Sequence, residues 1–226
     1  YAPKYQKQQE YQWGMTLGGP IIKNKLFFFV NYENTNKTYP NLNGYRQSGS
    51  RVNPDEADDV MQKIKDMAQR QGLSYDGTFA NPDIYTKSNK FGAKIDWNIN
   101  DFNKFSFRWS YVDAKQLNVV SSASSLNDDH YYFPFTSKTN SFTVELQSRL
   151  SPVVSNEARV SYVRVRDKRN VSSAFPMISL QVTGGSVNIG NERSSMANSL
   201  DQDIYTIEDN LTWYKGNHTY TFGTHN

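Results

Sequence analysis

The sequence has no cysteine, which excludes a disulfide framework, a zinc ribbon and a cysteine nucleophile. It also lacks a strong excess of either charge, because 25 lysine and arginine residues stand against 22 aspartate and glutamate residues. A net charge of +3 without a basic block argues against nucleic acid as a partner. No apolar run approaches the ~18 residues of a transmembrane helix. A helical membrane protein is therefore excluded, whereas membrane β-strands alternate and have low hydropathy.

Aromatic residues dominate what is present. The chain has 15 tyrosines and 13 phenylalanines, each more than its 11 leucines, although leucine usually leads in soluble proteins. This composition favours strands. Alternation of apolar and polar residues, which marks strands with two different faces, occurs in eight segments: 11–18, 25–33, 90–99, 104–112, 141–150, 157–167, 204–213 and 218–224. In the sixth segment the alternation loses phase at Val163 and Val165, which indicates a bulge or the end of the buried zone.

The alternation separates an aromatic face from a charged face. The aromatic face holds the residues that we expect to contact lipid: Phe91, Ile95, Trp97, Phe107 and Trp109. The charged face holds the residues that we expect to line a hydrated lumen: Lys94, Asp96, Arg108, Glu145 and Arg149. A soluble sandwich core would instead be filled by Val, Ile and Leu from both sheets.

The connections between these segments alternate between short and long. Short turns are expected at 19–24, 100–103, 151–156 and 215–217, and long polar loops at 39–86, 119–135 and 173–202. Outer-membrane barrels have this combination of short periplasmic turns and long extracellular loops. The prediction is an all-β fold, an antiparallel up-and-down transmembrane barrel meander with every long loop on one side. A soluble β-sandwich with a decorated edge is the alternative.

The first long loop contains one predicted helix, at 54–71. Asn53 suits the N-cap, Pro54 the first helical position, and Gly72 the end. We expect an apolar stripe to pack on the loop or the barrel rim through Val60, Ile64 and Met67, with Met61 and Ala68 beside them, while Lys63, Lys65 and Gln69 stay exposed. The alternative is a helix that binds a partner.

Two segments resemble a known family. Residues 13–33 read WGMTLGGPIIKNKLFFFVNYE, and residues 208–223 read EDNLTWYKGNHTYTFG. The first resembles the entry into the barrel of TonB-dependent outer-membrane receptors of the Oar-like branch in Bacteroidetes. The second is similar to a later hairpin of the same barrels.

The resemblance implies a 22-stranded barrel with a plug inside it, of which residues 1–226 would supply about the first eight strands. The implied location is the outer membrane of a Gram-negative bacterium. The implied partners are the membrane lipid, the rest of the barrel with its plug, which would contact the charged face, and TonB through the absent plug region. The implied function is uptake of an unidentified scarce ligand. A closed eight-stranded structural or adhesive barrel and a passive porin are the alternatives.

Candidate ligand contacts lie in the second long loop, at Tyr131, Tyr132, Phe133 and Phe135. Rigid aromatic side chains give contact area at low entropic cost, although the same residues suit an upper aromatic girdle. His130 follows Asp128 and Asp129, so a metal pair is conceivable, but solubility explains these residues more simply. Catalytic motifs are absent from the sequence, and we expect neither enzymatic activity nor a cofactor.

Overall fold

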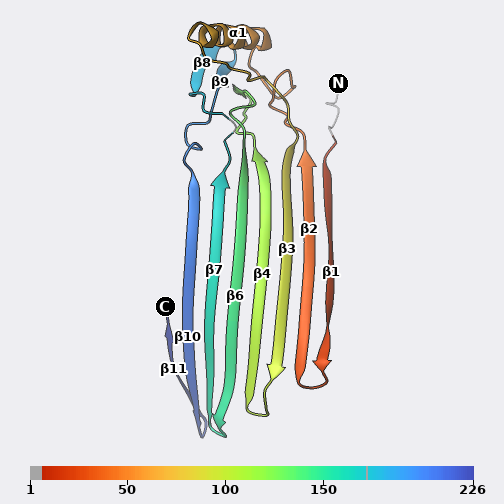
Figure 1. The fold of residues 1–226 in the computed structure, drawn as a ribbon, viewed down its shortest axis with the longest axis vertical. Coiled ribbons are helices and arrows are strands. Elements are labelled where there is room, and N and C mark those ends of the chain that lie inside the picture. The colour runs from red at the N-terminus through yellow and green to blue at the C-terminus, as the bar shows by residue number, and fades with distance from the viewer. Residues whose placement is uncertain (1–6, 172) are drawn as a thin grey trace.

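The computed structural model describes residues 7–171 and 173–226, and its main element is a sheet of eight antiparallel strands (Figure 1). Their order across the sheet is β1-β2-β3-β4-β6-β7-β10-β11. The strands are β1 (Gln9–Ile22), β2 (Leu26–Tyr39), β3 (Ile84–Asn98), β4 (Asn103–Asn118), β6 (Phe133–Ser151), β7 (Val154–Arg169), β10 (Ser199–Lys215) and β11 (His218–His225). The predicted meander of eight strands is therefore confirmed.

Most of the strands are longer than the alternating segments from which they were predicted. β6 has 19 residues and β10 has 17, whereas a tilted strand needs only ~9–11 residues to cross a bilayer. Most of the additional residues lie at the long-loop end of the strands, where the alternation of apolar and polar residues disappears. The predicted loop boundaries at 86, 135 and 202 were therefore wrong by a few residues each.

The short turns and the long loops lie at opposite ends of the sheet, as predicted (Figure 1). At the short-turn end, Asn24 has φ 61° and Gly216 has φ 59°, the left-handed conformation that Asn and Gly tolerate in tight turns. The register of β6 and β7 is continuous through Val163 and Val165. The alternation is therefore not interrupted by a bulge at these residues. It loses phase because the apolar zone of the strand ends there.

The described sheet is open. β1 pairs with β2 alone and β11 pairs with β10 alone, so the first and last strands are not neighbours. A closed eight-stranded barrel would require β1 and β11 to pair, and this alternative is not supported. The predicted pairing of 11–18 with 25–33 is confirmed.

The three long loops fold together into one unit, which we call the cap and which comprises residues 40–83, 119–132, 170–171 and 173–198. It contains α1 (Pro54–Arg70) and a small sheet of β5 (Ser125–Asn127), β9 (Gly185–Ile189) and β8 (Ile178–Val182). Figure 1 shows it above one end of the strands. Backbone hydrogen bonds join the loops: Arg51 N donates to Ala123 O at 2.6 Å, Asn53 N to Thr183 O at 2.9 Å and Ser186 N to Ser124 O at 2.9 Å.

The cluster of buried apolar side chains lies in the cap and draws on all three loops. Its members are Val52, Ala57, Met61, Ile64, Ala68, Tyr75, Leu126, Val187 and Ile189. The helix begins as predicted, since the Asn53 side chain accepts from Asp55 N and Glu56 N. The predicted apolar stripe was wrong at Met67, which is 52% exposed, and Lys65 is half-buried. The stripe is rotated because Ala57, Met61 and Ala68 pack against β8 and β9.

A buried carboxyl group joins two of the loops inside the cap. Tyr75 Oη donates to Asp128 Oδ2, and Tyr131 N donates to Asp128 Oδ1 at 3.0 Å. Gly190 N donates to the same carboxyl at 3.3 Å. Burial raises the pKa of Asp128 to about 7, although these backbone N–H groups act in the opposite direction. Asp128 is thus a structural group of the cap.

The eight-stranded sheet has no comparable core among the described residues. Ile95 and Trp97 are 39% and 41% exposed, as expected of side chains that would contact lipid and not other protein side chains. Phe91, Phe107 and Trp109 are half-buried. The rings of Phe91 and Trp109 pack on each other, and Phe107 lies between Ile95 and Val144 in the register. The described helix, α1, is neither long nor apolar enough to cross a bilayer.

The substitution Ile95→Lys tests the exposure of the apolar face. It is expected to destabilise the inserted protein by roughly 2–4 kcal/mol, because a lysine near the middle of the hydrocarbon must be desolvated. Ser106→Lys is the control, since Ser106 lies on the charged face between Asp96 and Glu145 in the register. Urea unfolding of the full-length protein in lipid vesicles measures both. Equal losses would contradict the assignment of the two faces.

The stability of the cap is expected to depend on pH through Asp128. Its folded-state pKa of about 7 lies above the ordinary value of ~3.9, so the folded cap binds the proton more tightly than the unfolded loops. The resulting stabilisation is complete below about pH 4 and is lost as the pH rises through about 7. Hydrogen exchange of α1 amides at pH 5.5 and 8.5, corrected for intrinsic rates, measures the effect. Asp128→Asn should remove it, and an unchanged pH dependence in that variant would refute the assignment.

Candidate functional site

The charged face of the sheet is hollowed and carries the polar groups available for function. Strand register places Asp96, Ser106, Glu145, Arg159 and Glu208 side by side across five strands. A hollow of about 560 Å³ spans β4, β6, β7, β10 and β11 on this face. The predicted lumen residues Lys94, Asp96, Arg108, Glu145 and Arg149 all lie on this face of their strands.

Arg159 is the centre of an ion-pair network on this face. Its guanidinium donates to Glu145 at 2.9 and 3.0 Å, to Glu157 at 2.8 Å and to Glu208 at 3.0 Å. His225 Nδ1 lies 2.9 Å from the other oxygen of Glu208. One cation with three carboxylates makes the network locally acidic. Such a surface suits contact with water or with polar protein groups and does not suit lipid.

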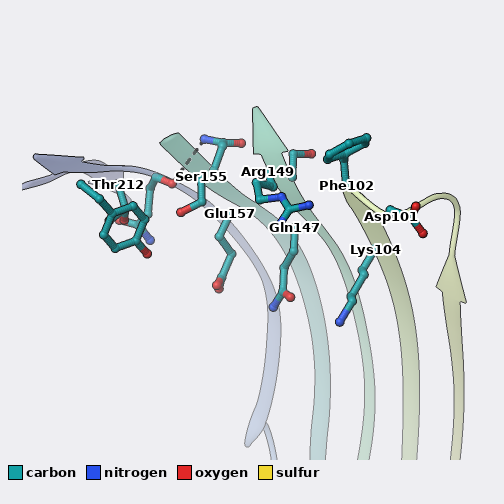
Figure 2. Close-up of a pocket in the computed structure, with 12 residues that line it drawn as sticks. Asp101, Phe102, Lys104, Gln147, Arg149, Ser155, Glu157 and Thr212 are labelled. Atoms are coloured by element: carbon teal, nitrogen blue, oxygen red, sulfur yellow. Dashed lines mark hydrogen bonds between the residues drawn. The ribbon is translucent and has the colours of Figure 1, made fainter. Parts of the chain in front are cut away.

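A second hollow, of about 440 Å³, lies on the same face near the short turns. Figure 2 shows Lys104, Gln147 and Glu157 on neighbouring strands with side chains that point the same way. The Arg149 guanidinium lies 5.0 Å from the centre of the Phe102 ring. Polar hollows therefore extend from this end towards the middle of the strands.

A third hollow lies at the opposite end of the charged face, where the strands enter the cap. Its volume is about 410 Å³. It is lined without any charged side chain, by residues of β2, β3, β4 and two cap loops: Tyr39, Pro40, Asn41, Leu42, Asn43, Ile84, Thr86, Gln116, Leu117, Asn118, Val119, Val120 and Ser121. Ser121 Oγ donates to Asn41 Oδ1 at 2.9 Å, which ties the two loops together. The sequence gave no signal for this hollow, since its lining comes from segments about 80 residues apart.

The aromatic residues proposed as ligand contacts do not form an exposed loop. Tyr132 and Phe133 are 4% and 3% exposed, and Tyr132 Oη donates to Asn127 O at 2.9 Å inside the cap. Phe133 and Phe135 belong to β6, where they pair with Asn118 and Gln116 on the charged side of the sheet. This register overturns their interpretation as an upper lipid-facing girdle. Tyr131 and Phe135 retain partial exposure, and Phe135 is the cross-strand neighbour of a residue that lines the third hollow.

A different set of residues, in two adjacent rows on the apolar side of the sheet, forms an aromatic group that we call the girdle: Tyr32, Phe91, Trp109, Phe142, Tyr162 and Tyr205. Ring centres of cross-strand neighbours are 4.8–6.4 Å apart from Phe91 to Tyr205. Two tyrosine hydroxyl groups of the girdle donate hydrogen bonds to residues on the adjacent strand, one row closer to the cap. Tyr32 Oη donates to Asn89 at 2.7 Å and Tyr162 Oη donates to Asp203 at 2.6 Å. Such amphipathic rings mark the boundary between hydrocarbon and water.

Asp128 and His130, which in sequence could form a metal pair, have other partners. Asp128 is engaged by Tyr75, while His130 Nε2 lies 3.2 Å from Asp76. Within residues 7–171 and 173–226, no group of three or more His, Asp or Glu side chains could hold a metal ion. The arrangement as a whole offers polar surfaces for binding and passage.

Comparison with known proteins agrees with this architecture. The chain is similar in fold to the outer membrane transporter YddB from Escherichia coli, with a TM-score of 0.58 and 11% sequence identity. The match covers 96% of this chain and 25% of that one, so the chain spans about a quarter of the transporter's length. No curated protein matches the sequence. The model of a family described as "Outer membrane beta barrel domain" matches residues 2–45 and 34–226.

Taken with the aromatic girdle and the open sheet, a family match over nearly the whole sequence identifies the chain as a member of the outer membrane β-barrel domain family, located in the outer membrane of a Gram-negative bacterium.

Proposed function

We propose that the chain forms part of the wall of a TonB-dependent receptor that takes up a scarce ligand across the outer membrane. The open sheet is the observation that supports this proposal most directly. Unpaired N–H and C=O groups along β1 and β11 would be costly in hydrocarbon. Both strands therefore pair with strands outside residues 1–226, in a barrel wider than eight strands. The resemblance of residues 13–33 and 208–223 to TonB-dependent receptors supports the proposal that this barrel has 22 strands and belongs to the Oar-like branch.

The charged face suits a plug domain inside such a barrel. Arg159 and its carboxylates, together with Lys94 and Asp96, offer hydrogen-bonding groups along the middle of the strands. A plug would bury these groups against polar partners and release them when TonB pulls on it. The third hollow and Phe135 lie on the same face beneath the cap, where a ligand captured outside the cell would enter.

Energy coupling is tested by uptake in intact cells. The full-length receptor is expressed in cells with and without TonB and supplied with labelled siderophores, oligosaccharides and peptides, since the scaffold does not identify the ligand. Accumulation of one class only where TonB is present is the expected result. Equal passage of small solutes with and without TonB would support a passive porin instead.

Deletion of residues 54–72 tests whether the strands insert independently of the fold of the cap. The deletion removes Ala57, Met61, Ile64 and Ala68 from the buried cluster, so the cap is expected to lose its fold. The strands should still insert, because long loops add little to barrel stability. Heat-resistant migration on a gel reports the barrel, and uptake of the ligand reports the cap. Loss of heat resistance would show that the helix supports the strands, and normal uptake would remove this loop from the capture site.

A further inference from the structure

We propose that the outward face of β3, β4, β6 and β7, directly above the girdle, binds the phosphate groups of outer-leaflet glycolipid. The site consists of six cations, which we call the basic band: Lys87, Lys115, Lys138, Arg164, Arg166 and Lys168. This site is distinct from the proposed uptake route. It rests on one part of the proposed function, the orientation that places the cap outside the cell.

Strand register fixes the height of the basic band. Above the row that holds Trp109, Phe142, Tyr162 and Tyr205, the next outward row is Tyr32, Phe91, Tyr111, Asn140, Arg164 and Asp203. The two rows beyond it contain Lys138 and Arg166, and then Lys87, Lys115 and Lys168. Rows on one face are about 7 Å apart along a strand. The cations therefore extend from the girdle through the layer where lipid headgroups lie.

Positive charge is concentrated on the outward face at this height. The three outward rows from β2 to β10 carry the six cations and only three anions: Asp113, Asp201 and Asp203. The two inward rows between them carry one cation, Lys90, and two anions, Glu33 and Asp167. Solvation alone would not favour the outward rows over the inward rows as the place for these cations.

The cations are also arranged at an energetic cost that a bound anion would offset. Lys87 is directly opposite Lys115, and Lys138 is directly opposite Arg166, although like charges in such positions are destabilising. Arg166 reaches Asp203 at 2.6 Å and Lys138 reaches Asp113 at 3.9 Å. Lys87, Lys115, Arg164 and Lys168 form no ion pair with any residue in the described part of the chain, although the Lys87 ammonium lies 5.4 Å from the centre of the Tyr85 ring. Four cations thus remain available to an external partner.

Phosphate on a lipid is the partner that fits this position. Arginine presents a planar fork to phosphate oxygens and lysine a mobile point charge, and clustered cations at a membrane surface attract anionic headgroups. The adjoining girdle would contact the acyl chains of the same molecule. A soluble phosphate would have no use for that apolar surface, so a phosphorylated glycolipid is favoured over a free anion.

The test measures lipid binding by the full-length protein purified in neutral detergent. Bisphosphorylated lipid A is titrated in, and native mass spectrometry counts the bound molecules. The variant Lys115→Gln/Arg164→Gln/Lys168→Gln removes three of the four cations that have no ion pair and leaves the contact of Lys87 with the Tyr85 ring intact, so no internal pair is broken. Its affinity is expected to fall roughly tenfold or more. The control Lys63→Gln/Lys65→Gln/Arg70→Gln changes the net charge equally on α1, away from the girdle, and should bind as the unmodified protein does.

Each outcome decides a separate point. Undiminished affinity in the first variant, or an equal loss in the control, would overturn the site. Equal binding of dephosphorylated lipid A would overturn phosphate recognition, and full displacement by inorganic phosphate would indicate a free-anion site. The titration requires neither TonB nor an imported ligand, so failure of the proposed uptake leaves this result standing. Surface labelling of whole cells at a Ser194→Cys variant checks the orientation, and an inaccessible cap would overturn the outer-leaflet assignment.

Discussion

Backbone hydrogen bonding in a medium without water is the constraint on which the rest of this structure depends. Hydrocarbon offers no partner for an N–H or C=O group, so each strand must be paired along its whole length on both sides. Seven strand-to-strand interfaces satisfy this requirement within the sheet. The two outer edges do not, and they are the structural reason to regard the chain as part of a wider barrel.

The same environment explains where the apolar residues lie. In a soluble domain they gather inside, whereas here the buried cluster lies in the cap and the sheet leaves large apolar residues such as Leu17, Ile95 and Phe222 exposed. In β3, β4, β6 and β7 the girdle separates a lower part with an apolar outward face from an upper part with a mostly polar one. β7 shows the change within three residues, from Tyr162 through Val163 to Arg164.

The cap is stabilised by its own core and by hydrogen bonds between loops that are distant in sequence. Its buried polar contacts, such as those of Asp128 with Tyr75 and Gly190, hold the three loops in one arrangement above the strands. The core of the cap is separate from the apolar outward surface of the sheet. The cap is therefore stabilised by burial away from water, whereas the sheet is suited to a lipid environment. That separation would allow the proposed lipid binding on one face and the proposed uptake through the charged face and the cap to occur in the same chain.

The sequence by itself determined the elements whose signal is local. Period-2 alternation marked all eight strands, Gly, Asn and Pro marked the short turns, and Asn53 marked the start of the helix. The tertiary structure decided what depends on distant segments or on register. The sequence predicted a loop at Phe133 and Phe135, because the alternation fades at this end of the strand. Pairing with β4 instead places both residues in a strand, on the charged side of the sheet. The sequence predicted Met67 to be buried, because an apolar stripe on a helix does not show which of its residues will contact the rest of the cap. The hollow between Asn41 and Ser121 and the basic band across four strands exist only once pairing has brought those residues together.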